Sequence, residues 1–251
     1  MLTSQRKQLI LQRLQSHGQI VAKDLSLELG TSEDTIRRDL RELASQGKLQ
    51  RVHGGALPSS LAAGDTSARQ LISTDEKVVL GRYAASMIKS GQVVLLDGGT
   101  TTLQIAKHIS PSLRATIITH SPVLAASLAA LPLLEIIMLG GTLFRHSMVN
   151  MGAQTLASTM QISADVYFMG VTGAHPQAGL TTADFEEAGL KRVFHSRAAE
   201  TIVLASSEKL LTASAYKVCD LKDISALVVS PATPADSIAA LKQSDVEVIF
   251  C

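Results

Sequence analysis

Between residues 32 and 46 the chain reads SEDTIRRDLRELASQ, a pattern that predicts one amphipathic helix. Ser32 can cap its first turn, and the two acidic residues that follow suit the positive end of the helix dipole. One face must pack against a core, because aliphatic side chains recur at helical spacing at Ile36, Leu40 and Leu43. The opposite face is left with polar and basic side chains, namely Thr35, Arg37, Arg38 and Arg41.

Two helical patterns precede this helix, and a short strand pattern follows it. The first has Thr3 and Ser4 as candidate N-caps and ends at His17-Gly18, and the second spans about Ala22–Leu29. The Gly-containing turn 29–32 matches the connection of a helix-turn-helix. Apolar and basic residues then mix over 48–56, which predicts a β-hairpin wing. The whole pattern predicts an N-terminal all-α winged helix-turn-helix.

The charge distribution agrees with a DNA-binding N-terminus. Residues 1–57 contain nine Lys or Arg and six Asp or Glu, whereas residues 58–251 contain fourteen and sixteen. Arginines near the start of a recognition helix can reach guanine edges or phosphates in the major groove. Any single arginine could instead form a surface pair with Asp34 or Glu42, because charged helix faces are usually only solvated. The combined pattern favours double-stranded operator DNA as the partner.

One string resembles the DNA-binding domain of the DeoR family of bacterial transcriptional regulators. It runs through Thr35–Leu40, then Gly47, and then Arg51–Gly55. The resemblance implies a cytoplasmic repressor, usually of genes for sugar uptake or breakdown, in which Asp39 holds an arginine rather than touching DNA. With the wing included, the expected DNA-binding residues are Ser32, Thr35, Arg37, Arg38, Arg41, Lys48, Arg51 and His53.

The composition changes after residue 57. Residues 58–74 are rich in small and turn-forming types, which predicts a flexible linker. A helical pattern then starts at Asp75. We therefore expect three parts: a winged helix-turn-helix in 1–57, a linker in 58–74 and an effector-sensing α/β domain in 75–251.

Strand and helix patterns alternate through the second domain, which predicts a mainly parallel sheet covered on both faces by helices. The expected strands are Val93–Leu96, Thr116–Ile118, Ile136–Leu139, Val166–Met169, Thr201–Ala205, Leu227–Val229 and Val246–Phe250. The expected helices include Thr102–His108, Val123–Ala130, Gln154–Met160, Glu186–His195 and Ala235–Gln243.

Ligands of such sheets bind beyond the carboxyl ends of the strands, where this chain has four small, donor-rich loops. These are Asp97–Thr102, Thr119–Ser121, Gly140–Thr142 and Gly170–Gly173. Glycine amides and threonine hydroxyls suit an anion, so together the loops predict one small polar ligand, most simply a phosphorylated one. Each loop alone could be only a tight turn or a helix cap.

Nothing in the sequence predicts a cofactor, a metal site or a catalytic residue set. It contains neither the Gly-Lys-Ser/Thr element of a Walker loop nor the GxGxxG fingerprint, which disfavours an ATPase or a dehydrogenase. Asp97, His120 and Glu187 are the only general-base candidates near the loops, and none has an obvious partner in the sequence.

The resemblance to DeoR-type regulators continues in this half. Asp97–Thr102, Gly140-Gly141, Glu187-Ala188 with Lys191-Arg192, and Ser207–Lys209 occur in the order of DeoR effector domains. It implies a fold similar to ribose-5-phosphate isomerase and a phosphorylated sugar as ligand. The resemblance implies that Lys209 supplies a cation and that Glu187 accepts hydrogen bonds from sugar hydroxyls, although both could be ordinary surface residues. The phosphate and its neighbouring hydroxyls would be held by Asp97, Gly99, Thr100, Thr101 and Thr102.

The loops give the rest of the expected effector site: Thr119, His120, Ser121, Gly140 and Gly141. Three strand ends depart from the family pattern. His120 stands where asparagine is common, Ser206 where aspartate is common, and Val229-Ser230-Pro231 replaces a common Ile-Thr-Asp. His120 could pair with a more acidic effector or simply be packed.

We therefore expect a ligand-gated repressor of a carbohydrate operon, acting as a dimer or tetramer. One alternative is an aldose–ketose isomerase fused to a DNA-binding module, and another is an architectural DNA binder. No apolar run is long enough to span a bilayer, the N-terminus lacks a signal peptide, and the two cysteines suit free thiols in the cytoplasm. The effector, the operator and the sign of the response stay open.

Overall fold

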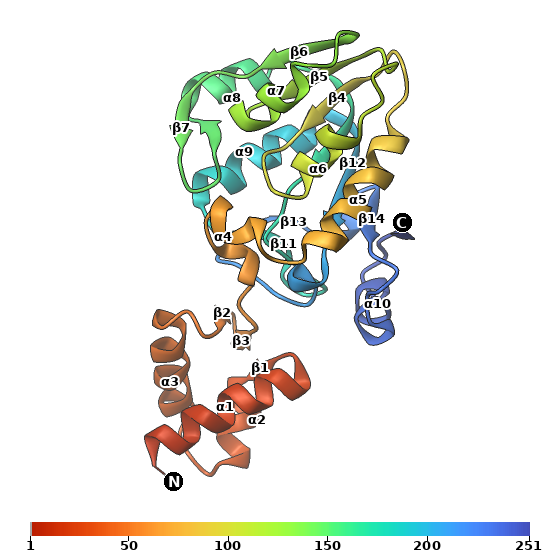
Figure 1. The fold of residues 1–251 in the computed structure, drawn as a ribbon. Coiled ribbons are helices and arrows are strands. Elements are labelled where there is room, and N and C mark those ends of the chain that lie inside the picture. The colour runs from red at the N-terminus through yellow and green to blue at the C-terminus, as the bar shows by residue number, and fades with distance from the viewer. Residues whose placement is uncertain (1) are drawn as a thin grey trace.

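The computed structural model describes residues 2–251, in which a small N-terminal unit and a larger second unit each have their own core (Figure 1). The N-terminal unit contains three helices, α1 (Thr3–His17), α2 (Ala22–Glu28) and α3 (Glu33–Ser45). It also has a small antiparallel sheet in the order β1-β3-β2, built from β1 (Ile20–Val21), β2 (Gln50–Val52) and β3 (Gly55–Leu57).

The core of this unit explains the helical pattern of α3. Ile36, Leu40 and Leu43 are all buried and pack with aliphatic residues of α1 and α2. Gly18 ends α1 in the left-handed conformation, with φ of +71°. The expected winged helix-turn-helix is confirmed. Two details differ: strand β1 was not predicted, and the N-cap of α1 is Leu2 rather than Thr3 or Ser4.

The second unit is built on a seven-stranded sheet in the order β15-β14-β12-β9-β4-β5-β6, in which every neighbouring pair is parallel. The α/β class with a mainly parallel sheet is therefore confirmed. Each strand predicted from the sequence lies in this sheet, with shifts only at its ends. The strands are β4 (Val93–Leu96), β5 (Ala115–Thr119), β6 (Leu134–Met138), β9 (Ala164–Met169), β12 (Ala198–Ala205), β14 (Ala226–Val229) and β15 (Val248–Phe250).

Helices cover both faces of the sheet because successive strand residues point to opposite sides. Val94 and Leu96 pack with α5 (Thr74–Met87), α6 (Thr102–His108) and α7 (Pro122–Leu128). Leu95 points to the other face, which holds α9 (Phe185–Ser196) and α10 (Ala235–Lys242). Helix α8 (Ala153–Thr159) packs beside α9.

Short elements that the sequence did not predict lie outside the main sheet. One is a hairpin of β7 (Thr142–Phe144) and β8 (Val149–Met151). Another is a three-stranded sheet of β10 (Gly173–His175), β11 (Gly179–Thr182) and β13 (Tyr216–Cys219). The 3₁₀ helices are η1 (Leu61–Ala63), η2 (Ser207–Lys209) and η3 (Leu221–Asp223).

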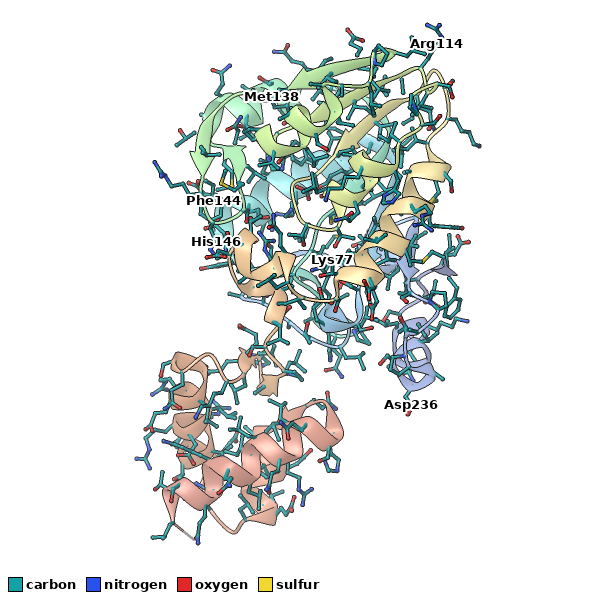
Figure 2. All side chains as sticks on the ribbon, viewed as in Figure 1. Lys77, Arg114, Met138, Phe144, His146 and Asp236 are labelled. Atoms are coloured by element: carbon teal, nitrogen blue, oxygen red, sulfur yellow. The ribbon has the colours of Figure 1, made fainter. Side chains whose placement is uncertain are left out.

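The segment 58–74, expected to be a flexible linker, instead contains η1 and helix α4 (Thr66–Gln70). It packs against the larger unit through backbone contacts. The amide of Ala213 donates to the carbonyl of Pro58 at 3.1 Å, and the amide of Thr66 donates to the carbonyl of His146 at 3.0 Å. Figure 2 shows Lys77 in the interior near this segment, whereas Arg114 lies at the far end of the molecule. No helix in the described part of the chain is long and apolar enough to cross a membrane.

Candidate functional site

The exposed face of α3 carries the arginines expected to meet DNA. Ser32 caps the helix by accepting a hydrogen bond from the amide of Thr35 at 3.2 Å. Arg37 pairs with Glu33 one turn earlier, at 2.7 Å, rather than with Asp34 or Glu42. An exposed pair of this kind is worth only about 0.3–0.5 kcal/mol, so a phosphate can replace it. Among residues 2–251 no carboxylate lies within ion-pair distance of two further exposed arginines, Arg38 and Arg41.

The wing brings a second set of basic side chains beside α3. Lys48, Arg51 and His53 are all exposed. Arg37 of α3 lines one surface hollow together with Arg51 and His53 of the wing. A groove edged by basic groups from two elements suits a phosphate backbone that passes between them.

Asp39 is fully buried and forms an ion pair with Arg6 of α1. The hydrogen bond from this pair raises the pKa of the Arg6 guanidinium. Asp39 therefore joins α3 to α1, which is the arginine-holding role that the resemblance implied.

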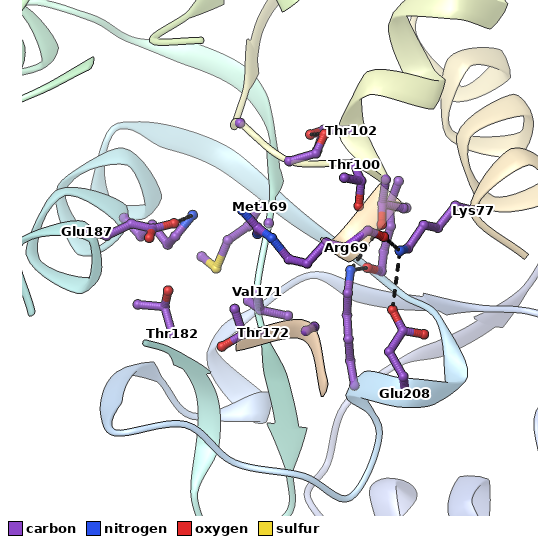
Figure 3. A pocket seen from close by; sticks show the side chains of 18 residues that line it. Arg69, Lys77, Thr100, Thr102, Met169, Val171, Thr172, Thr182, Glu187 and Glu208 are labelled. Atoms are coloured by element: carbon purple, nitrogen blue, oxygen red, sulfur yellow. Dashed lines mark hydrogen bonds and ion pairs between the residues drawn. The ribbon is translucent and has the colours of Figure 1, made fainter. Parts of the chain in front are cut away.

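One polar pocket of the larger unit lies where the strand order reverses. From β4 the chain builds outward through β5 and β6 on one side, and from β9 through β12, β14 and β15 on the other. Such a switch point leaves a crevice at the carboxyl ends of the two central strands. The pocket is lined by the loops after β4 and β9, by η2, by α5 and α9, and by the segment between the two units (Figure 3).

Lysine and threonine side chains meet on one wall of the pocket. The ammonium of Lys209 is buried and donates to the hydroxyl of Thr101 at 3.0 Å. Burial lowers the pKa of Lys209 to about 8. Lys77 lies beside Glu208 at 3.6 Å, and burial lowers the pKa of Lys77 as well. Burial thus disfavours the charged form of both lysines, and a further negative charge nearby would favour it.

Behind this wall lies a buried network centred on Asp97. One carboxylate oxygen of Asp97 accepts hydrogen bonds from Lys191 at 2.5 Å, from the hydroxyl of Tyr167 at 2.8 Å and from the amide of Gly170 at 2.9 Å. On its other oxygen it accepts from His120 at 2.8 Å and from the amide of Gly98 at 2.9 Å. The charge of Lys191 and these hydrogen bonds overcome burial and hold the pKa of Asp97 well below its usual range.

His120 is packed rather than open to a ligand. It is 1% exposed, and its second ring nitrogen lies 2.9 Å from the carbonyl of Asn150. Phe194 contacts the ring edge-on, with centroids 5.0 Å apart. Of the two alternatives for this histidine, the structure favours packing.

The structure brings only part of the expected effector set together. Six of the expected residues line the pocket: Gly99, Thr100, Thr101, Thr102, Glu187 and Lys209. Asp97 and His120 lie behind its wall and Thr119 is fully buried, whereas Ser121 lines a neighbouring hollow. Gly140 and Gly141 form a tight turn against α8, where the hydroxyl of Thr155 donates to the carbonyl of Gly140 at 2.6 Å. The other six expected residues, Asp97, Thr119, His120, Ser121, Gly140 and Gly141, therefore lie outside the pocket.

Several lining residues were not predicted. Lys191 had been noted only as part of the family resemblance, and Thr172 belonged to a predicted loop without being assigned a role. No local sequence signal marks Arg69 or Lys77, because one lies in the presumed linker and the other within an amphipathic helix. The unassigned polar lining residues are Arg69, Lys77, Thr172, Thr182, Lys191 and Glu208. No group of three metal-binding side chains occurs in residues 2–251.

Comparison with known proteins gives matches along most of the chain. The family model for the "DeoR-like helix-turn-helix domain" matches residues 6–60, and that for the "DeoR C terminal sensor domain" matches residues 72–231. The "putative aga operon transcriptional repressor" of Escherichia coli O157:H7 is 34% identical over 99% of this chain and 94% of its own. The "HTH-type transcriptional repressor GlcR" of Bacillus subtilis is 33% identical over 91% of this chain and 88% of its own.

Solved structures include a ribose 5-phosphate isomerase A of Methanocaldococcus jannaschii. It is 15% identical, covers 54% of each chain and gives a TM-score of 0.41. A likeness at this level says nothing about activity. The two full-length relatives are named as transcriptional repressors rather than as enzymes.

Proposed function

Because the chain belongs to the DeoR family of transcriptional regulators, we propose that it represses a carbohydrate-metabolism operon and that a phosphorylated sugar in the sensor-domain pocket modulates the repression. The repressor names of the two relatives support the first part. The excess of positive charge in the pocket supports the second. An isomerase is not favoured, because the relatives are regulators and Glu187 already pairs with Lys191 at 3.1 Å.

The observation that carries the proposal is the chemistry of the pocket lining. Lysine and arginine side chains and the hydroxyls of 100–102 surround one end, which suits a phosphate group. Glu187, Thr172 and Thr182 lie on the opposite side in Figure 3, where they would accept from or donate to sugar hydroxyls.

On DNA, α3 would enter the major groove with Thr35, Arg37, Arg38 and Arg41 toward base edges and phosphates. Lys48, Arg51 and His53 of the wing would follow the backbone beside the groove. Two such units are needed to read two half-sites, so we propose a dimer or larger homo-oligomer in the cytoplasm.

Binding to the promoter upstream of its own gene tests the DNA assignment. Arg37→Ala and Arg38→Ala should each weaken binding about 5- to 100-fold, as expected for loss of a base or phosphate contact. Arg114→Ala, which removes an exposed charge at the far end of the sensor domain, is the matched control. Affinity should fall steeply with salt. Full affinity and site preference in both α3 variants would make the assignment wrong.

A thermal-shift screen of sugar phosphates, each beside its unphosphorylated sugar, tests the ligand class. Only phosphorylated members should raise the melting temperature, and Thr101→Val should reduce the shift because Thr101 lies against Lys209. A hit should also change operator affinity in the same buffer. If the free sugars stabilise as well as the phosphates, or if Thr101→Val shifts like the wild type, the phosphate pocket is rejected.

A further inference from the structure

We propose that the guanidinium of Arg69 binds the anionic group of the effector, so that occupation of the pocket fixes the segment that carries the DNA-binding unit. Arg69 lies in α4, within the segment 58–74 between the two units, and it also lines the pocket. This inference rests on the proposed function, because it concerns a ligand in the same pocket.

The first support is that Arg69 has no anionic partner. Among residues 2–251 no carboxylate lies within 4 Å of it, and its Nε is buried without a hydrogen-bond acceptor. One terminal nitrogen donates only to hydroxyls, at 3.1 Å to Thr66 and at 3.4 Å to Ser147. Burial lowers the pKa of Arg69. Glu187, Asp97 and Asp65 act on it only from beyond ion-pair distance. A largely buried cation without a direct ion-pair partner is costly, and an anionic ligand in contact with it would lower that cost.

The second support is the excess of cations around Arg69. Arg69, Lys77, Lys191 and Lys209 line the pocket, against Glu187, Glu208 and, behind the wall, Asp97. The carboxylates are already engaged: Glu187 pairs with Lys191, and Glu208 lies beside Lys77 and accepts from Ser206 at 2.8 Å. In Figure 3 the Arg69 side chain crosses the pocket between Thr100 and Thr172. Its planar fork of donors suits two oxygens of one phosphate group.

The third support is that the segment is held from both sides. Lys77 donates to the carbonyl of Arg69 at 2.7 Å and to that of Ile72 at 2.6 Å. At the other end, the hydroxyl of Ser60 donates to the carbonyl of Thr172, another lining residue. The hydroxyl of Ser59 donates at 2.8 Å to the carbonyl of Gly47, which follows α3. A ligand held by Arg69 therefore acts on a stretch of chain that also contacts the end of the recognition helix.

A residue with a strained backbone lies near the end of the same segment. Ser73, directly before α5, has φ of +46°, a left-handed conformation that a residue other than glycine adopts at a cost of about 1–2 kcal/mol. Such strain persists where surrounding contacts maintain it, which suits a joint whose conformation depends on those contacts.

The test uses the full chain and inorganic phosphate as the probe, titrated against chloride at equal ionic strength. We expect Arg69→Gln to weaken phosphate binding about 10- to 100-fold, the range for hydrogen bonds to a charged group. Arg69→Lys should retain part of the affinity, and Arg114→Gln should bind like the wild type. Hydrogen exchange of the amides in 66–72 should slow when phosphate binds to the wild type and remain unchanged in Arg69→Gln. Circular dichroism without phosphate verifies that each variant is folded.

The outcomes separate this inference from the proposed function. If Arg69→Gln binds phosphate like the wild type while Lys209→Met does not, Arg69 is not a ligand and the phosphate pocket stands. If phosphate binds through Arg69 but leaves exchange in 66–72 unchanged, the fixing of the segment is wrong. If neither phosphate nor any sugar phosphate binds the wild type, the proposed function fails and this inference fails with it.

Discussion

At the scale of single residues, the most consequential charge of the sensor domain does not face the ligand. Asp97 follows β4 in a loop typical of anion sites, and the sequence therefore predicted it as a binding residue. The structure gives its two oxygens five donors instead. It links the loops after β4 and β9 to Lys191 of α9. Its expected role is to hold the pocket walls together.

Asp97→Asn should destabilise the sensor domain by about 3–5 kcal/mol, because it leaves the buried Lys191 without one of its two carboxylates. Urea unfolding followed by circular dichroism measures this loss. Asp236→Asn, at the start of α10 on the periphery, should cost less than about 0.5 kcal/mol.

The pH dependence of this loss has a definite sign. The pKa of Asp97 is lower in the folded than in the unfolded chain, so its contribution is complete above about pH 4, the unfolded value. The difference between wild type and Asp97→Asn should shrink as the pH falls below that value. A difference that stays constant down to pH 2 would contradict this assignment.

Lys209 should make effector affinity depend on pH in the alkaline range. Its pKa is about 8 in the empty pocket, and a bound dianion should raise it, so binding takes up a proton between about pH 8 and 10. Affinity for a sugar phosphate from the screen should therefore fall as the pH rises from 7.5 to 9.5. The phosphate itself does not titrate there, since its second pKa is about 6. Calorimetry in two buffers of different ionisation enthalpy detects the proton, and a constant affinity over this range would exclude Lys209 as the contact.

At the scale of elements, the strands of the main sheet were predictable because all are parallel and the central ones are buried, and such strands form nearly continuous apolar runs. The edge strands β6 and β15 are partly exposed but are also largely apolar. The short strands β7, β8, β10, β11 and β13 were not predicted, because segments of three or four residues of mixed polarity show no reliable period. Segment 58–74 has the composition of a linker, so neither the helix α4 nor the role of Arg69 in the pocket was predicted.

The pocket could be predicted only in part, because the loops at strand ends are visible in the sequence but the strand order is not. The loops after β4 and β9 meet because these strands are neighbours at the switch point. Gly140-Gly141 has the same composition, yet it follows β6 at the edge of the sheet, away from that crevice. The composition of the loops alone therefore assigns too many residues to the pocket.

The wing depends on a close approach that only glycine allows. A Cβ atom on Gly55 would lie 1.7 Å from the carbonyl oxygen of Ile20. Ile20 lies in β1, which pairs with β3, the strand that contains Gly55. Gly55→Ala should therefore break this pairing, move Arg51 and His53 away from α3, and lower operator affinity. Gly18→Ala is the control: its Cβ meets open space, so it should cost only about 1 kcal/mol of left-handed strain and leave affinity unchanged. Gel-shift and denaturation measurements on both variants decide this, and equal behaviour would contradict it.

At the scale of the whole molecule, the two units differ in charge and do not share a core. The N-terminal core contains buried residues from Ile10 to Ala56, and the two sensor-domain cores begin at Leu80 and Leu95. The connection between them consists mainly of the packed segment 58–74 and its contacts with Gly47 and Thr172. Positive charge is concentrated in the unit that meets DNA, whereas the rest of the chain is slightly acidic. Separate cores of this kind are typical of domains that can move relative to each other while each keeps its own fold.

Separate cores predict two unfolding transitions, only one of which responds to the effector. A ligand at 100 times its dissociation constant stabilises the state that binds it by about 2.7 kcal/mol. That gain should move the urea midpoint of the sensor domain and leave the midpoint of residues 2–57 in place. Fluorescent labels on Cys251 and on a cysteine introduced at Gln12 would follow each unit separately, after Cys219 has been replaced by serine. One shared transition that shifts as a whole would mean that segment 58–74 couples the two units into a single cooperative fold. The effector would then change the stability of the DNA-binding unit as well as its position.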